Sequence, residues 1–190
     1  MLSYSILEIC RKANRLVRKF ETSDPRQLCD DMDINLMEEA LGTEEDSIKG
    51  LMVVCNRIKT IMINSDLPDL IRNFLIGHEL GHAVLHWKDS SQYTDYGVFN
   101  DISGKEREAN LFAAELLLGD SDDLYEEMHD SELTVFQIAA THNVPYELLA
   151  YKLEIMEEQG YEVPELPYEP DARFLSGTLG MEDICRRWED

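Results

Sequence analysis

The segment His78–His82 carries the strongest chemical signal in the chain, because it reads H-E-L-G-H. In a helix, residues i and i+4 lie on one face, so the two imidazoles could bind one Zn²⁺ ion together. Glu79 could then reach a water molecule at the metal and take a proton from it, as in zinc-dependent peptide hydrolysis. Such a short motif also occurs by chance, and the alternative is an ordinary buried helix whose two histidines are hydrogen-bonded.

The residues around this motif predict a helix over about residues 68–87. Pro68 is favoured in a first helical turn, and Asp69 adds negative charge near the positive end of the helix dipole. Apolar residues recur close to a 3.6-residue period, namely Leu70, Ile71, Phe74, Leu75, Leu80, Val84 and Leu85. Gly77 and Gly81 each cost about 1 kcal/mol of helix propensity relative to alanine. We therefore expect a metal site or a tightly packed neighbouring helix close to their backbone.

A catalytic zinc site usually has three protein ligands and leaves a fourth position for water. His86 does not suit this role, because eight residues of helix would place it about 12 Å from His78 along the axis, at about 1.5 Å per residue. We interpret His86 as a helix-end or packing residue, since polar and cationic side chains are favoured near a helix C-terminus.

The third ligand is expected on a second helix, over about residues 104–118. Ser103 and Glu106 fit a capping box, which would give Glu106 a structural role. Glu108 and Glu115 share a face with apolar residues, and a buried carboxylate needs a partner such as a metal ion. We predict Glu108 as the third zinc ligand, with Glu115 as a reserve ligand or a group that supports the site. The alternative is that both carboxylates are solvated.

Four segments of the chain occur in a characteristic order. They are Thr22-Ser23-Asp24-Pro25, Ile61-Met62-Ile63-Asn64, His78-Glu79-Leu80-Gly81-His82-Ala83-Val84-Leu85-His86 and Glu108-Ala109-Asn110-Leu111-Phe112-Ala113. This order resembles the ImmA/IrrE family of metallo-endopeptidases from prophages and mobile elements, over about residues 5–155. One segment departs from the family pattern, since Leu117-Leu118-Gly119-Asp120-Ser121 stands where members often have Leu-Met-Pro. We therefore expect the cleft wall beyond this helix to differ, which bears on substrate choice more than on the metal site.

The resemblance implies one Zn²⁺ per chain, with His78, His82 and Glu108 as ligands and Glu79 as the catalytic base. It also implies a helix-turn-helix repressor as the substrate, cleaved to release an integrated element. Two other functions stay open. The chain could be a non-catalytic anti-repressor that binds the repressor without cutting it, or an acidic protein that mimics DNA.

The composition is strongly acidic, with 17 basic and 39 acidic residues and a net charge of −22. This charge disfavours direct binding to nucleic acid, whose phosphates require Lys and Arg, and is compatible with a basic protein partner. We expect no membrane span, because no run approaches about 18 consecutive apolar residues. The N-terminus lacks the features of a secretory signal, and Cys10, Cys29, Cys55 and Cys185 are scattered. We therefore expect a cytoplasmic protein with reduced thiols.

The fold is expected to be of the α+β class, with a mostly helical, zincin-like core and a small β-hairpin or sheet beside the H-E-x-x-H helix. The hairpin is predicted over Gly50 to Asn64, with a turn near Asn56 and Arg57. Its strand edge could pair with an extended substrate. Amphipathic helices are predicted from Ser3 to Phe20 and from Asp24-Pro25 to about Met32.

The segment Leu133–Leu153 has helix-turn-helix spacing, with Asn143 suited to a left-handed turn. Its second helix offers Lys152 beside acidic residues, so we predict a helical pair, over about residues 133–156, that packs on the core rather than reads DNA. His142 is expected at the surface or in the turn. The peptidase domain is predicted over residues 1–160, followed by an acidic, Pro-containing linker and tail over residues 161–190.

The segment between the two catalytic helices, Lys88 to Ile102, is predicted to be a loop beside the cleft. Tyr93 or Tyr96 within it is a candidate for polarising the scissile carbonyl, although loop tyrosines commonly just pack against their neighbours. The tail beyond residue 170 has apolar residues at roughly helical spacing, and it could dock on the core, pair with another molecule or cover the cleft.

Overall fold

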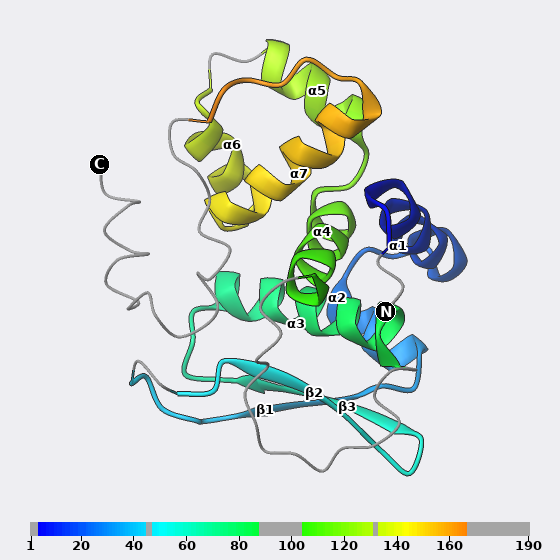
Figure 1. The fold of residues 1–190 in the computed structure, drawn as a ribbon. Helices are drawn as coiled ribbons and strands as arrows, with labels where there is room; N and C mark the ends of the chain where they lie inside the picture. The colour runs from blue at the N-terminus through cyan, green and yellow to red at the C-terminus, as the bar shows by residue number, and fades with distance from the viewer. Residues whose placement is uncertain (1–3, 45–46, 88–103, 131–132, 167–190) are drawn as a thin grey trace.

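The computed structural model describes residues 4–44, 47–87, 104–130 and 133–166 (Figure 1). The predicted tyrosines Tyr93 and Tyr96 and the tail beyond residue 166 lie outside these ranges. The elements of the described residues are α1 Ile6–Phe20, α2 Pro25–Asp31, β1 Asn35–Glu39, β2 Gly50–Cys55, β3 Ile58–Asn64, α3 Asp69–Leu85, α4 Lys105–Leu118, α5 Ser121–Asp130, α6 Val135–Thr141 and α7 Tyr146–Gln159. The predicted α+β class is confirmed.

The sheet has three strands in the order β1-β3-β2. The predicted hairpin is confirmed: β2 and β3 pair antiparallel around a turn in which Asn56 and Arg57 have φ values of 51° and 69°. Positive φ at both central residues is the backbone that a two-residue hairpin turn requires. The third strand, β1, was not predicted, and it pairs parallel with β3. Its sequence, Asn-Leu-Met-Glu-Glu, does not have the alternation or the β-branched residues typical of a strand.

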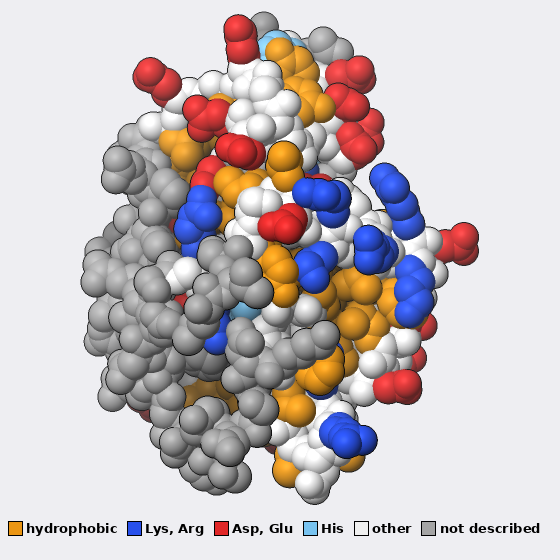
Figure 2. All heavy atoms as spheres, turned by 45° about the vertical axis from the view of Figure 1, so that its right-hand side comes forward, with side chains coloured by type: hydrophobic (Ala, Val, Ile, Leu, Met, Phe, Trp, Pro, Cys, Tyr) orange, Lys and Arg blue, Asp and Glu red, His pale blue; other side chains and the backbone are white. Residues whose placement is uncertain are grey.

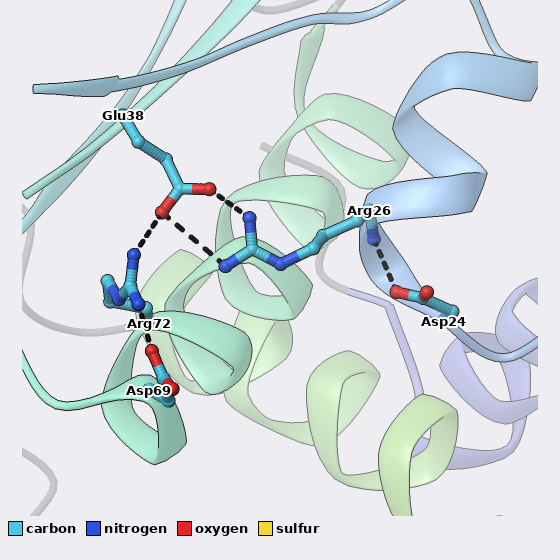
Figure 3. Close-up of polar contacts among 5 residues, drawn as sticks. All are labelled: Asp24, Arg26, Glu38, Asp69 and Arg72. Carbon is cyan, nitrogen blue, oxygen red and sulfur yellow. Dashed lines mark hydrogen bonds and ion pairs between the residues drawn. The ribbon is translucent and has the colours of Figure 1, made fainter. Parts of the chain in front are cut away.

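A network of charged side chains joins β1 to the helices beside it (Figure 3). Glu38 of β1 pairs with Arg26 of α2 and with Arg72 of α3, and Arg72 also pairs with Asp69 in the first turn of α3. Hydrogen bonds from Arg26 and Arg72 hold the pKa of Glu38 below its ordinary value. Single surface ion pairs contribute about 0–1 kcal/mol, but a connected network also sets the position of α3 relative to the sheet.

Helix α3 lies between the sheet and α4, and α4 is flanked by α1 and α7 (Figure 1). One of the two glycines of α3, Gly81, allows a close approach of α4. A Cβ atom added at Gly81 would lie 3.1 Å from Ala109 Cα and 3.2 Å from the Ala109 carbonyl oxygen, whereas one added at Gly77 would lie 3.4 Å from Leu117 Cδ1. The predicted tightly packed neighbouring helix is therefore present, and it is α4.

The predicted helical pair consists of α6 and α7, which are joined through Asn143 with a φ of 52°. Lys152 of α7 is fully buried and donates hydrogen bonds to Glu115 Oε2 at 2.7 Å and to the Gly119 carbonyl oxygen at 2.6 Å. The only cation on the central part of α7 is therefore unavailable to a DNA phosphate. Helix α7 is a core element that packs against α4 and α1.

The surface charge is unevenly distributed. Figure 2 shows Lys and Arg side chains gathered on the flank that carries α1, where the sequence supplies Arg11, Lys12, Arg15, Arg18 and Lys19. Acidic side chains prevail around α5. None of the helices in the described ranges has the length and apolar character needed to cross a bilayer. Cys10 and Cys29 are buried free thiols, and Cys55 is an exposed one.

Candidate metal centre

The two histidines of the H-E-x-x-H motif lie in the most buried part of α3. Their side chains are 4% exposed, and their Nε2 atoms face each other at 3.2 Å. Phe74, one turn before His78, packs edge-on against the His78 ring. The helical spacing of the sequence and the burial of α3 between sheet and α4 together bring both imidazoles to one point.

A carboxylate from α4 completes this group, and it belongs to Glu106. Its Oε2 lies 3.2 Å from His78 Nε2, and its Oε1 lies 3.3 Å from His82 Nε2. Neighbouring donors around a tetrahedral Zn²⁺ lie about 3.3–3.6 Å apart when the bonds are about 2.0–2.2 Å long. The two imidazole nitrogens lie at close to this spacing, and each is as close to one of the two oxygens of Glu106. With one ligand atom taken from each residue, the three atoms lie within 4.8 Å of one another. In the described residues, these three side chains form the group able to hold a metal ion.

The charges of the group also suit a cation. Burial lowers the pKa of His82 to about 4, so its imidazole is neutral at physiological pH and has a lone pair to donate. Burial alone would raise the pKa of Glu106, but hydrogen bonds from the two histidines lower it well below its usual range. For His78, burial opposes the charged form, yet the hydrogen bond to Glu106 raises its pKa. A carboxylate against two buried imidazoles is a donor set that zinc accepts.

Glu79 lies beside this group and faces the sheet. Its Oε2 is buried without a hydrogen-bond partner in the described residues. A Cβ atom at Gly50, the first residue of β2, would lie only 3.2 Å from Glu79 Oε1, so the glycine leaves space for this carboxylate. Burial raises the pKa of Glu79 to about 7, a value suited to a group that accepts and returns a proton near neutral pH. An orphaned oxygen next to the histidines fits a site that receives water and a metal.

The structure places the predicted third ligand, Glu108, elsewhere. Its Oε2 lies 3.0 Å from His86 Nε2, and its Oε1 accepts a hydrogen bond of 3.0 Å from the backbone N–H of Tyr4. Residues i and i+2 of a helix point about 200° apart, so Glu106 and Glu108 cannot face the same point. In this geometry Glu106, and not the predicted Glu108, lies beside both imidazoles. The expected capping box involves Ser103, which lies outside the described residues. Helix α4 begins after Gly104 with no side-chain cap hydrogen bond.

Glu115 lies away from the imidazoles and does not serve as a reserve ligand in this geometry. It accepts hydrogen bonds from Asn14 Nδ2 at 2.6 Å and from Lys152 Nζ at 2.7 Å. His86 is the C-cap residue of α3, as expected for a helix-end histidine. His142 is the C-cap residue of α6 and pairs with Glu127 at 2.7 Å.

Asn110 is a residue of the site that the sequence analysis missed. Its Oδ1 lies 2.8 Å from His78 Nδ1, and its side chain is 2% exposed. An acceptor at Nδ1 leaves Nε2 of His78 free to bind a metal. The sequence does contain a signal for it: Asn110 follows Glu106 by four residues, so both lie on one face of α4, and Asn110 is a polar residue in an apolar stretch.

Comparisons with known proteins show the family to which the chain belongs. The family model described as the IrrE N-terminal-like domain, of a peptidase family, matches residues 29–154. "Uncharacterized immunity region protein 2" of Bacillus phage phi105 is 36% identical over 138 residues, which are 73% of this chain and 84% of that protein. "Metallopeptidase ImmA" of Bacillus subtilis (strain 168) is 30% identical over 152 residues, 79% of this chain and 86% of that protein. The histidine pair on α3, the adjoining carboxylate and these matches lead to one conclusion: the chain belongs to the ImmA/IrrE family of metallopeptidases.

Proposed function

We propose that the chain is a zinc-dependent endopeptidase that holds one Zn²⁺ through His78, His82 and Glu106 and uses Glu79 as its catalytic base. The observation that carries this proposal is the convergence of two buried imidazoles and one partly exposed carboxylate, whose ligand atoms lie within 4.8 Å of one another. Of the ligands that the sequence suggests, this proposal retains His78 and His82, and Glu106 replaces Glu108.

Each residue has a distinct task in this reaction. A bound Zn²⁺ supplies Lewis acidity and makes water nucleophilic at neutral pH. His78 and His82 present Nε2 to the ion, and Asn110 holds the ring of His78 in the required orientation. Glu79 takes the proton from the attacking water and delivers it to the amine that leaves. Its pKa of about 7 makes both transfers accessible near neutral pH.

The sheet offers a place for the substrate backbone. Strand β2 is at one edge of the described sheet, and its first residue, Gly50, contacts the Glu79 carboxylate. An extended peptide paired with this edge would bring one of its carbonyl groups towards Glu79 and the two histidines. Such pairing would favour an extended or locally unfolded segment of the substrate over a helix.

For the substrate, we propose a cytoplasmic helix-turn-helix repressor that controls a prophage or other mobile element. Support comes from the relative of Bacillus phage phi105, which is named as an immunity region protein, and from the relative named Metallopeptidase ImmA. The net charge of −22 favours a basic partner such as a DNA-binding protein. Burial of Lys152 in α7 argues against the chain itself binding DNA.

Metal analysis tests the ligand set. The purified chain should contain about one Zn²⁺, and His78→Ala, His82→Ala and Glu106→Gln should each lose it. Glu115→Gln is the matched control, since it also neutralises a carboxylate of α4 but leaves the imidazoles untouched. Undiminished zinc in both histidine variants would refute the site.

Co-expression with candidate repressors of the same element, followed by intact-mass analysis, tests the reaction. The wild type should produce two repressor fragments, and Glu79→Gln should bind the repressor without cutting it. If Glu79→Gln relieves repression as well as the wild type does, the chain is an anti-repressor that acts by binding. If the Glu79→Gln variant competes with operator DNA for an intact repressor, the protein acts as a DNA mimic.

A further inference from the structure

A chain of buried polar side chains extends from His82 away from the metal-binding group. His82 Nδ1 lies 3.0 Å from His86 Nδ1, and His86 Nε2 lies 3.0 Å from Glu108 Oε2. All three side chains are 4–5% exposed, so water does not replace these contacts. The second oxygen of Glu108 accepts the backbone N–H of Tyr4 at 3.0 Å, which holds the carboxylate in place.

When His82 Nε2 donates its lone pair to a metal, only one arrangement of protons gives each hydrogen bond between His82, His86 and Glu108 one donor and one acceptor. His82 must then carry its proton on Nδ1, and it donates that proton to His86 Nδ1. His86 Nδ1 is the acceptor in this bond, so a neutral His86 carries its own proton on Nε2. This second proton is donated to Glu108 Oε2. Each N–H donor in this series of side chains then meets one acceptor.

The two histidines of the motif are thus supported differently. His78 Nδ1 meets the neutral amide oxygen of Asn110 at 2.8 Å. His82 Nδ1 is linked, through a second imidazole, to a buried carboxylate. A negative group at the end of such a chain polarises both N–H bonds and makes the metal-binding nitrogen a stronger donor.

We propose that Glu108, acting through His86, is a positioning residue that fixes the ring orientation and the proton position of His82 for metal binding. This inference rests on the proposed function, because it assumes that His82 Nε2 is a metal ligand. It also gives His86 and Glu108 a common task, which neither the helix-end position of His86 nor the sequence reading of Glu108 as a ligand provides.

Zinc affinity, measured with Zn²⁺ alone against a competing chelator, is the first readout. Glu108→Gln should weaken binding by about 10- to 100-fold, the range found when partners of metal-ligating histidines are removed. His86→Phe should weaken binding to a similar degree. His86→Gln should bind closer to the wild type, because its amide can both accept from His82 and donate to Glu108. Glu115→Gln, the buried-carboxylate control, should lower stability without weakening zinc binding.

A double variant separates a positioning role from a general loss of stability. Because Glu108 acts through His86, adding Glu108→Gln to His86→Phe should cause no further loss of zinc affinity. Nitrogen NMR of the zinc-loaded protein, with labelled histidine, should place the His82 proton on Nδ1 in the wild type. In His86→Phe this N–H signal should broaden or shift, whereas the signals of His78 should stay in place.

The outcomes also separate this inference from the function on which it rests. If the wild type binds no zinc, or His82→Ala binds it normally, the metallopeptidase proposal fails. If the wild type binds zinc and Glu108→Gln binds it equally well, only the positioning role fails. If Glu108→Gln loses all zinc while Glu106→Gln retains it, Glu108 is a direct ligand and the positioning role is overturned. Additive losses in the double variant would overturn it as well.

Discussion

Replacing Gly81 with alanine should destabilise the protein, whereas the same change at Gly77, one helical turn earlier, should stabilise it. Both residues lie in the interior of α3, so both substitutions gain about 1 kcal/mol of helix propensity. The new methyl group at Gly77 would meet Leu117 and Ala113 side-chain atoms at 3.4–3.8 Å, which is ordinary contact. We therefore expect Gly77→Ala to raise the free energy of unfolding by about 1 kcal/mol.

The methyl group at Gly81 has no such space. It would lie 3.1 Å from Ala109 Cα and 3.2 Å from the Ala109 carbonyl oxygen, and a backbone cannot rotate away as a side chain can. Overpacking of this kind typically costs about 1–3 kcal/mol, which exceeds or offsets the gain in propensity. The net change should be a destabilisation of about 0–2 kcal/mol. Because propensity cancels between the two variants, their difference of about 1–3 kcal/mol measures the overpacking alone.

Urea unfolding followed by circular dichroism, in the presence of a chelator, is the appropriate assay, since bound metal would add its own stabilisation. In thermal unfolding, each kcal/mol should shift the midpoint by about 2–4 °C in a chain of this size. Equal stabilisation by Gly77→Ala and Gly81→Ala would refute the close contact between α3 and Ala109. Equal destabilisation would mean that both glycines serve a purpose other than the approach of α4.

Three further outcomes are expected. Glu79→Gln should retain about one Zn²⁺ per chain by metal analysis and lose peptide cleavage by about 10²- to 10⁴-fold; loss of the metal would instead make Glu79 a ligand. Lys152→Met should cost about 3–5 kcal/mol in urea unfolding, because it leaves the Glu115 carboxylate buried without its cation, and adding Glu115→Leu should recover much of that loss; no recovery would contradict the pairing. At pH 8, iodoacetamide should modify the exposed Cys55 and spare Cys10, whose pKa burial raises to about 12, as mass spectrometry can show. Because the pKa of Cys10 is raised, the folded protein keeps the thiol proton to a higher pH than the unfolded protein does. The contribution of the buried thiol to stability is therefore complete below pH 9 and declines between pH 9 and 12. Modification of Cys10 and Cys55 at equal rates would contradict the burial of Cys10.

The amino-acid sequence by itself determines those helices and turns whose signals lie within a few neighbouring residues. The helix around His78 and His82, the hairpin with its turn at Asn56 and Arg57, and the turn at Asn143 all follow from periodicity and turn chemistry within a few residues. These signals survive in the structure because burial and local preference favour the same conformation. The histidine pair is likewise local, since four residues of helix place both rings on one face.

The tertiary structure decided which partner each polar side chain meets. The pairing of β1 with β3 joins segments more than twenty residues apart, and the acidic sequence of β1 carries no signal for it. Lys152 is buried because α4 provides Glu115 at the right depth. Neither fact can be read from a periodicity, because each depends on a contact with a distant segment.

The identity of the acid that joins the two imidazoles is the clearest case. Glu106 and Glu108 lie on the same helix, and the sequence pattern predicts a capping role for Glu106 and metal binding for Glu108. The choice depends on the rotation of α4 about its own axis, which the contact between Gly81 and Ala109 sets. That rotation directs Glu106 to His78 and His82, and it directs Glu108 to His86. The sequence alone determined that two histidines share one face of a helix, and the packing of α4 against that helix determined which carboxylate lies beside them, because residues two apart on a helix point in nearly opposite directions.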